Sequence, residues 1–185
     1  EVRALIARVE AIAAARDAEA LTALAAPDIV TSFGGAGTLD EFRALVSEPR
    51  FWDDFGSVVA GGAVVSDDWT DGSRVFLPAA FETWPADLDP YEFLYSDRPG
   101  ALLRAGPSEG APVLAPIHEA ILAEVPYFEG WNGLYEAGWA YLCAAPLGCG
   151  FARRSEVRSP IDWRAVFLQA APSAPWVLET FVAGD

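Results

Sequence analysis

The residues best suited to covalent chemistry are the two cysteines, Cys143 and Cys149, which flank the five-residue stretch AAPLG. The neighbouring stretches GWAYL and CGFA have the alternating pattern of strands, and AAPLG has the composition of a hairpin turn. Facing strands would place both cysteines on one face, within reach of a disulfide. We therefore expect a bridge, which persists in an oxidising compartment. Two free thiols in a cytosolic protein, or a metal pair, are the competing interpretations.

Other side chains offer little catalytic chemistry. His118 is the single histidine, so a metal would find at most three soft ligands, and no placeable nucleophile with an orienting third group accompanies it. The paired carboxylates Asp53–Asp54 and Asp67–Asp68 are sequence neighbours, and such neighbours point to different sides of an element. The chain has no lysine, which excludes a phosphate-binding GxxxxGK loop and Schiff-base chemistry.

A partial calcium-loop pattern occurs at Asp67, Asp71 and Gly72. Trp69 breaks the pattern, and Pro78 stands where a bidentate glutamate is needed. We interpret the segment as a solvated turn, and we expect no metal and no cofactor.

Aromatic residues gather between 127 and 139. Flat rings could line a groove for a sugar or a peptide, or they could fill a small core. The candidate ligand-binding residues are Tyr127, Trp131, Tyr135 and Trp139.

The elements that would position these residues differ between the two parts of the chain. Residues 1–24 predict two helices, the second capped by Asp17, and DIVTSFGG predicts a strand. GGAGTLDEFRALV predicts a glycine-rich turn into a helix, with Thr38 and Glu41 spaced as a capping box. An anion-binding helix N-terminus is the functional alternative for that turn, but two acidic residues in the first helical turn favour a structural role.

From Tyr91 onward, short apolar runs separated by Gly and Pro predict a small all-β barrel, with PADLDP as the linker before it. After residue 158, DWRAVFLQ and PWVLETFVA alternate like an antiparallel hairpin, which is too small to fold alone. We therefore expect one domain from residues 1–90 plus 159–185, and a second from residues 91–158.

Two stretches of the predicted barrel carry a family resemblance. Residues 101–117 and 138–157 resemble the opening and closing strands of bacterial SH3-like (SH3b) domains, and the matching residues are Arg104, Gly106, Pro107, Ser108, Gly138, Trp139, Gly150 and Phe151. The resemblance covers about 65 to 70 residues. It departs from the family pattern at Leu102, where an asparagine is usual, and in the long connection PYFEGWNGLYEA. It implies an extracytoplasmic module of a kind that often binds peptidoglycan or its peptides.

The flanking segments resemble another family. The order of two helices, a strand, a further helix and a final hairpin is similar to the two ends of NTF2-like (cystatin-like) α+β domains. In such domains helices pack in the hollow of a curved sheet, and the resemblance implies that the barrel is inserted between early elements and the last hairpin.

The overall composition restricts the partners. With 52% hydrophobic residues the chain is expected to fold, and its 185 residues suffice for two modules. A net charge of -15 disfavours nucleic acid and anionic membrane surfaces, and no apolar run is long enough to span a membrane. Because the chain begins at Glu1 and contains no methionine, we expect that a leader or anchor was removed.

The sequence thus predicts an α+β protein of the bacterial envelope, extracytoplasmic or periplasmic, with a disulfide between Cys143 and Cys149. Its predicted role is non-catalytic recognition of peptidoglycan, a peptide or a protein partner by the barrel. The alternative is a small-molecule-binding or enzymatic pocket in the NTF2-like domain, with the barrel as a lid or an oligomerisation surface.

Overall fold

The computed structural model describes residues 1–34, 37–125 and 131–184. The chain divides into two compact units. Unit 1 consists of Glu1–Thr83 and Ile161–Asp185, and unit 2 of Trp84–Pro160. Helices pack on a sheet in unit 1, and a second sheet forms most of unit 2, so the predicted α+β class is confirmed.

Two helices of unit 1, those over Ala18–Thr22 and Leu39–Val46, begin where local side chains satisfy their first N–H groups. The Asp17 carboxylate accepts from Ala20 N (2.9 Å), and Thr38 and Glu41 form the predicted capping box. The helices are α1 (Val2–Ala15), α2 (Ala18–Thr22), α3 (Leu39–Val46), α4 (Pro49–Ala60) and the short α5 (Ala79–Glu82).

The sheet of unit 1 joins strands from both ends of the chain. Its order is β1 (Ala25–Val30), β11 (Val177–Val182), β10 (Arg164–Gln169), β3 (Ser73–Leu77), β2 (Val64–Ser66). β1 runs parallel to β11, and the other pairs are antiparallel. The predicted C-terminal hairpin is therefore present, and it supplies the two strands in the middle of the sheet. β1 differs from the predicted strand because it starts at Ala25 and includes Pro27.

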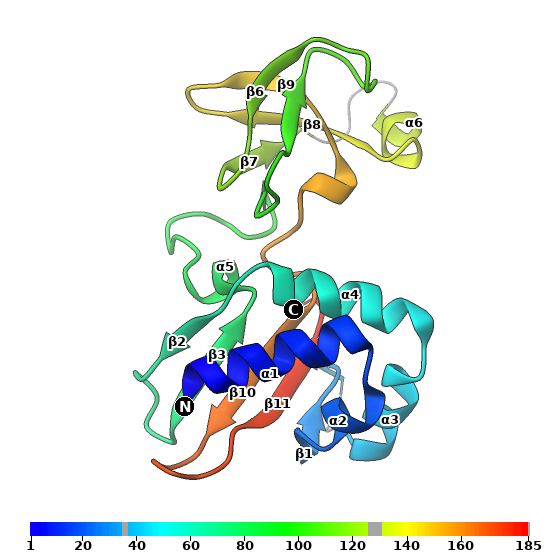
Figure 1. The fold of residues 1–185 in the computed structure, drawn as a ribbon. Helices are drawn as coiled ribbons and strands as arrows, with labels where there is room; N and C mark the ends of the chain where they lie inside the picture. Colours follow the sequence, from blue (N-terminus) through cyan, green and yellow to red (C-terminus); the bar gives the residue numbers. More distant parts are fainter. Residues whose placement is uncertain (35–36, 126–130, 185) are drawn as a thin grey trace. The chain divides into compact units, whose positions relative to one another are not determined.

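The core of unit 1 lies between the sheet and the helices α1 and α4, which cover the same face of the sheet (Figure 1). Alternation along the strands sends Val75, Leu77 and Phe167 toward the helices. Phe51 and Phe55 of α4 pack on Phe181 of β11, with ring centroids 5.0 Å and 5.8 Å apart. This interior is filled by apolar and aromatic side chains.

Unit 2 consists mainly of a six-stranded sheet in the order β4 (Phe93–Tyr95), β7 (Ile121–Glu124), β8 (Trp139–Ala144), β9 (Gly148–Arg153), β5 (Leu102–Arg104), β6 (Val113–Pro116). All neighbouring strands are antiparallel. A short helix, α6 (Trp131–Glu136), precedes β8, and the 3-10 helix η1 (Arg154–Glu156) follows β9.

Residues 85–90, interpreted from the sequence as a linker, pack within unit 2. The Trp84 ring lies 6.2 Å from the Tyr95 ring, and its Nε1 donates to the carbonyl oxygen of Leu88 (3.0 Å). Among the described residues, no helix has the length and apolar composition needed to cross a membrane.

Candidate functional site

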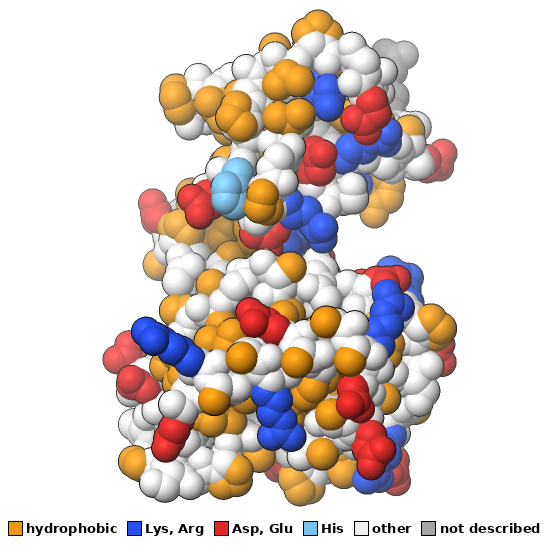
Figure 2. All heavy atoms as spheres, in the orientation of Figure 1, with side chains coloured by type: hydrophobic (Ala, Val, Ile, Leu, Met, Phe, Trp, Pro, Cys, Tyr) orange, Lys and Arg blue, Asp and Glu red, His pale blue; other side chains and the backbone are white. Residues whose placement is uncertain are grey.

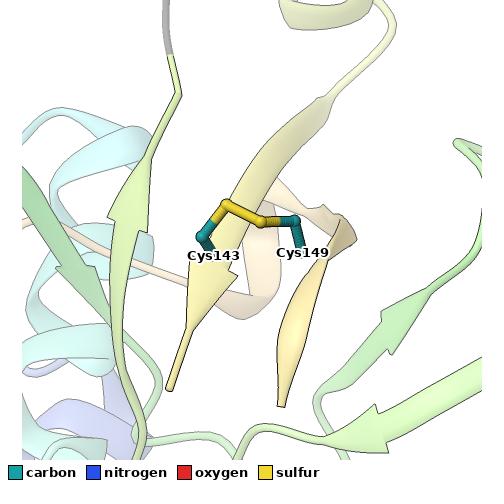
Figure 3. The surroundings of a disulfide bond; sticks show 2 residues. All are labelled: Cys143 and Cys149. Carbon is teal, nitrogen blue, oxygen red and sulfur yellow. A yellow bond between two sulfur atoms is a disulfide. The ribbon is translucent and has the colours of Figure 1, made fainter. Parts of the chain in front are cut away.

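The disulfide predicted from the sequence is present between Cys143 of β8 and Cys149 of β9 (Figure 3). The two residues are direct cross-strand partners, next to the turn that connects the strands. The bridge therefore ties the turn end of the β8–β9 hairpin.

One cross-strand row of side chains runs from the disulfide to the edge of the sheet. Cys143 pairs with Ala123 of β7, and Ala123 pairs with Phe93 of β4. Directly opposed residues in an antiparallel sheet point to the same face, so all of them share one face. Ala123 is the small residue between the Phe93 ring and the disulfide, and its short side chain leaves the sheet surface hollow at that place.

The hollow is an apolar groove of about 600 Å³. It is lined by Leu88, Phe93, Ile121, Ala123, Cys143, Ala144, Ala145, Pro146, Gly148 and Cys149. No charged residue is among these, and the volume lies within the range of small-molecule sites. We refer to these residues as the disulfide groove.

The edge strand β4 borders the disulfide groove. Ser96 N donates to Ala120 O, and Glu124 N donates to Glu92 O, so residues 92 and 96 bond toward β7. The backbone N–H and C=O of Tyr95 point to the side away from β7, where they form hydrogen bonds with the backbone of Arg158. Phe93, two residues before Tyr95, therefore directs its backbone N–H and C=O away from β7. The groove thus lies beside the outward-facing backbone of Phe93, while Tyr95 of the same edge is already paired with Arg158.

Two of the aromatic residues predicted to bind a ligand lie near the other end of the β8–β9 hairpin, each beneath an arginine. The Arg154 guanidinium is 4.2 Å from the Tyr135 ring centroid, and Arg154 also pairs with Glu124. The Arg153 guanidinium is 4.2 Å from the Trp139 ring centroid. Tyr135 is 50% exposed, whereas Trp139 is 4% exposed. Only Tyr135 therefore offers a ligand much ring surface in this arrangement.

The other two predicted residues cannot be placed in the same way. Tyr127 lies outside the described residues, as does the side chain of Trp131, whose backbone begins α6.

Arg153 also organises the charges at this end of the hairpin. Its Nε donates to the Glu109 carboxylate at 2.6 Å, and Arg104 lies 3.4 Å from the other Glu109 oxygen. These contacts, the Arg153 hydrogen bond foremost, lower the pKa of Glu109.

Acidic and basic side chains are interspersed among apolar ones on the face that Figure 2 displays.

The remaining candidates for chemistry are not assembled into a site. His118 is exposed, and its ring nitrogen lies 3.9 Å from the Glu119 carboxylate. Asp71, from the partial calcium pattern, accepts two hydrogen bonds from Arg74, and this contact lowers the pKa of Asp71. Within the described ranges, no three His, Cys, Asp or Glu side chains cluster in a way that could hold a metal ion.

A pocket between the helices and the sheet of unit 1 would favour the enzymatic alternative. That space contains Phe51, Phe55, Phe167 and Phe181. In the described part of the chain, the buried polar residues are Ser66, Arg74, Ser96, Arg158 and Arg164, so no buried carboxylate is found there. The described residues therefore place no candidate acid or base in this interior.

Sequence reasoning missed the disulfide groove. Its row joins residues 93, 123, 143 and 149, and only the pairing of four strands brings them together. The signal that could have found it is the alternation of β7, which puts Ile121 and Ala123 on one face.

Comparisons with known proteins give one structural likeness. No family model matches the chain, and no curated protein matches it. Among solved structures, the chain is similar to an NTF2-like protein with a cystatin-like fold from Novosphingobium aromaticivorans. The sequence identity is 16%, the TM-score is 0.35, and the match covers 98% of this chain and 77% of that chain.

Proposed function

We propose that this protein is a non-catalytic recognition protein of the bacterial envelope, in which unit 2 binds peptidoglycan, a peptide or a protein partner. The observation that carries the proposal is the disulfide groove, an apolar hollow of about 600 Å³ beside the edge of β4. The combination suits a peptide-like ligand, because the Phe93 backbone can make hydrogen bonds at the edge and the apolar hollow receives a side chain.

The groove walls support a preformed site. Cys143 and Cys149 are held by the disulfide, and Ala123 lies in the middle of the sheet between β4 and β8. A site fixed in this way loses little conformational entropy when a ligand binds. The half-exposed Tyr135 ring, with Arg154 against it, is a second surface of the same unit that can contact the ligand.

Two parts of the proposal rest on observations other than the groove. Peptidoglycan is proposed because residues 101–117 and 138–157 resemble SH3b domains. The envelope location is proposed because a disulfide persists in an oxidising compartment. Intact mass of protein purified from a bacterial periplasm tests the bridge on which this location rests: we expect a mass two hydrogens below the reduced chain, and free thiols would contradict the bridge.

The binding test is a pull-down on insoluble peptidoglycan at moderate salt, with four forms of the full chain. Ala123→Gln fills the groove between Phe93 and the disulfide. Ala111→Gln makes the same change at a half-exposed alanine of unit 2 that does not line the groove. Tyr135→Ala removes the exposed ring. We expect retention of the native protein and of Ala111→Gln, and loss of retention for Ala123→Gln.

Each other outcome has a defined meaning. Loss for Tyr135→Ala with retention of Ala123→Gln moves the site to the Tyr135 surface. Equal loss for Ala111→Gln and Ala123→Gln contradicts the groove. No retention of the native protein contradicts peptidoglycan as the ligand, and a screen of immobilised peptides against the same four forms then tests the peptide part of the proposal.

A further inference from the structure

A second cavity lies in unit 1, where the N-terminal half of α1 lies beside the end of β10 and the start of β11 (Figure 1). Its volume is about 350 Å³, enough for a small organic molecule. Leu5, Leu24 and Trp176 supply apolar lining, and Arg8 and Gln169 supply polar groups. The lining thus combines an apolar wall with one cationic side chain.

Arg8 is unusual among the arginines of this acidic chain. Between described residues, eight of the twelve form ion pairs, as is expected where 27 acidic residues surround 12 basic ones. Within the described residues, Arg3 and Arg8 alone have no ion pair, hydrogen bond or ring contact. The sequence explains this for Arg8, because the helical neighbours three and four positions away are Ala4, Leu5, Ala11 and Ile12.

Trp176, another lining residue, carries an unsatisfied donor. Its indole Nε1 is buried, and it has no hydrogen-bond partner in the part of the chain that the structure describes. A buried donor without an acceptor is costly, and an unplaced water or ligand is a common explanation. Trp176 also lines the cavity, so its indole N–H signal can report on a molecule bound there.

From these observations we propose that the cavity binds a small organic acid with an apolar body and a carboxylate. The carboxylate pairs with the Arg8 guanidinium, and the apolar body packs on Leu5, Leu24 and Trp176. Glu1 is the one acidic residue of the lining, and its carboxylate lies 3.5 Å from the Gln169 amide nitrogen. The ligand carboxylate therefore lies toward Arg8. This site is independent of the recognition proposed for unit 2.

The probes for the test are octanoate and octanamide, which share the same chain and differ in charge. Binding is followed through the indole N–H signals of the ¹⁵N-labelled full chain, and Trp176→Phe identifies the Trp176 signal because it removes that N–H. We expect octanoate to shift the Trp176 signal and to bind about fivefold more tightly than octanamide, which is the ratio expected for one partly exposed ion pair.

Arg8→Gln and Arg3→Gln are a matched pair, since both arginines lie on α1, both are exposed, and only Arg8 lines the cavity. We expect Arg8→Gln to weaken octanoate binding about fivefold, to the level of octanamide, and Arg3→Gln to leave it unchanged. Equal losses in the two variants, equal affinities for octanoate and octanamide, or a Trp176 signal that does not respond to octanoate would each overturn the proposal.

Discussion

At the scale of single residues, arginine performs tasks in unit 2 that lysine could not. The Arg153 guanidinium stacks on the Trp139 ring while its Nε donates to Glu109. A planar group with several donors can stack and pair at once, whereas an ammonium group is a point charge. Arg153 and Arg154 each lie over an aromatic ring and also pair with a carboxylate. The use of arginine in place of lysine in this chain suits such double contacts.

The pKa of the Glu109 carboxyl depends on its hydrogen bond with Arg153. Its pKa is lowered chiefly by the hydrogen bond from Arg153. A lowered folded-state pKa means that the carboxylate stabilises the fold above its unfolded-state pKa, and that this contribution is lost as the pH falls through the folded-state pKa. We expect Arg153→Gln to raise the Glu109 pKa toward its ordinary value, as measured by NMR titration of the side-chain carboxyl. An unchanged Glu109 pKa would contradict the assigned cause.

The disulfide gives a second prediction at this scale. Replacing Cys143 and Cys149 by serine removes a cross-link that closes a short loop. The unfolded chain then gains conformational entropy, which lowers the free energy of unfolding. The chain-entropy model gives a loss of about 2 kcal/mol for such a loop. We expect chemical denaturation to show this loss in unit 2 and no change in unit 1. Reduced native protein should behave like the double variant, and equal stability of all forms would disprove a stabilising role.

Residue types predicted some of these contacts and could not predict others. The cysteine bridge followed from two strand-like stretches and a turn, which are local features. The position of Trp139 beneath Arg153 depends on the register of β8 against β9, where these two residues are direct partners. Composition alone could not tell such a covered ring from the half-exposed Tyr135.

At the scale of elements, close approach of two strands explains a glycine. A Cβ at Gly150 of β9 would lie 2.6 Å from the Arg104 backbone oxygen and 2.8 Å from the Leu103 side chain of β5. We expect Gly150→Ala to separate β5 from β9 and to destabilise unit 2 by about 1–3 kcal/mol, measured by chemical denaturation.

Gly133 of α6 is the matched control, because no atom lies within 4 Å of the Cβ it lacks. Alanine favours a helix more than glycine does, so Gly133→Ala should leave unit 2 as stable or raise its stability by up to about 1 kcal/mol. Equal destabilisation by the two changes would show that the approach of β5 and β9 is not the cause.

Local signals predicted element boundaries well where one side chain caps a helix. Asp17 and the pair Thr38 and Glu41 were predicted as caps and are confirmed. Helix α6 was not predicted, because Gly133 and its aromatic neighbours are typical of a loop. The groove was missed for a related reason, since its hollow exists only when β4, β7, β8 and β9 are paired.

At the scale of the whole molecule, the chain order makes unit 1 depend on its last segment. β10 pairs with β3 and β11, and β11 pairs with β1. These two strands therefore join β1 on one side of the sheet to the β3–β2 pair on the other. Phe167 and Phe181 are fully buried there. Without residues 161–185, β1 has no partner, and β2 with β3 is a two-stranded ribbon, which is marginal in water.

We therefore expect removal of residues 161–185 to unfold unit 1. Unit 2 should remain folded, because its segment Trp84–Pro160 is continuous and contains the whole six-stranded sheet and the disulfide. In a ¹H–¹⁵N spectrum, signals of unit 1 should collapse to unfolded positions while those of unit 2 keep their dispersion. Removal of residues 183–185, which follow β11, is the control and should leave both sets of signals intact. Dispersed unit 1 signals in the longer truncation would mean that residues 1–83 fold without the central strands, and loss of unit 2 signals would mean that its fold depends on unit 1.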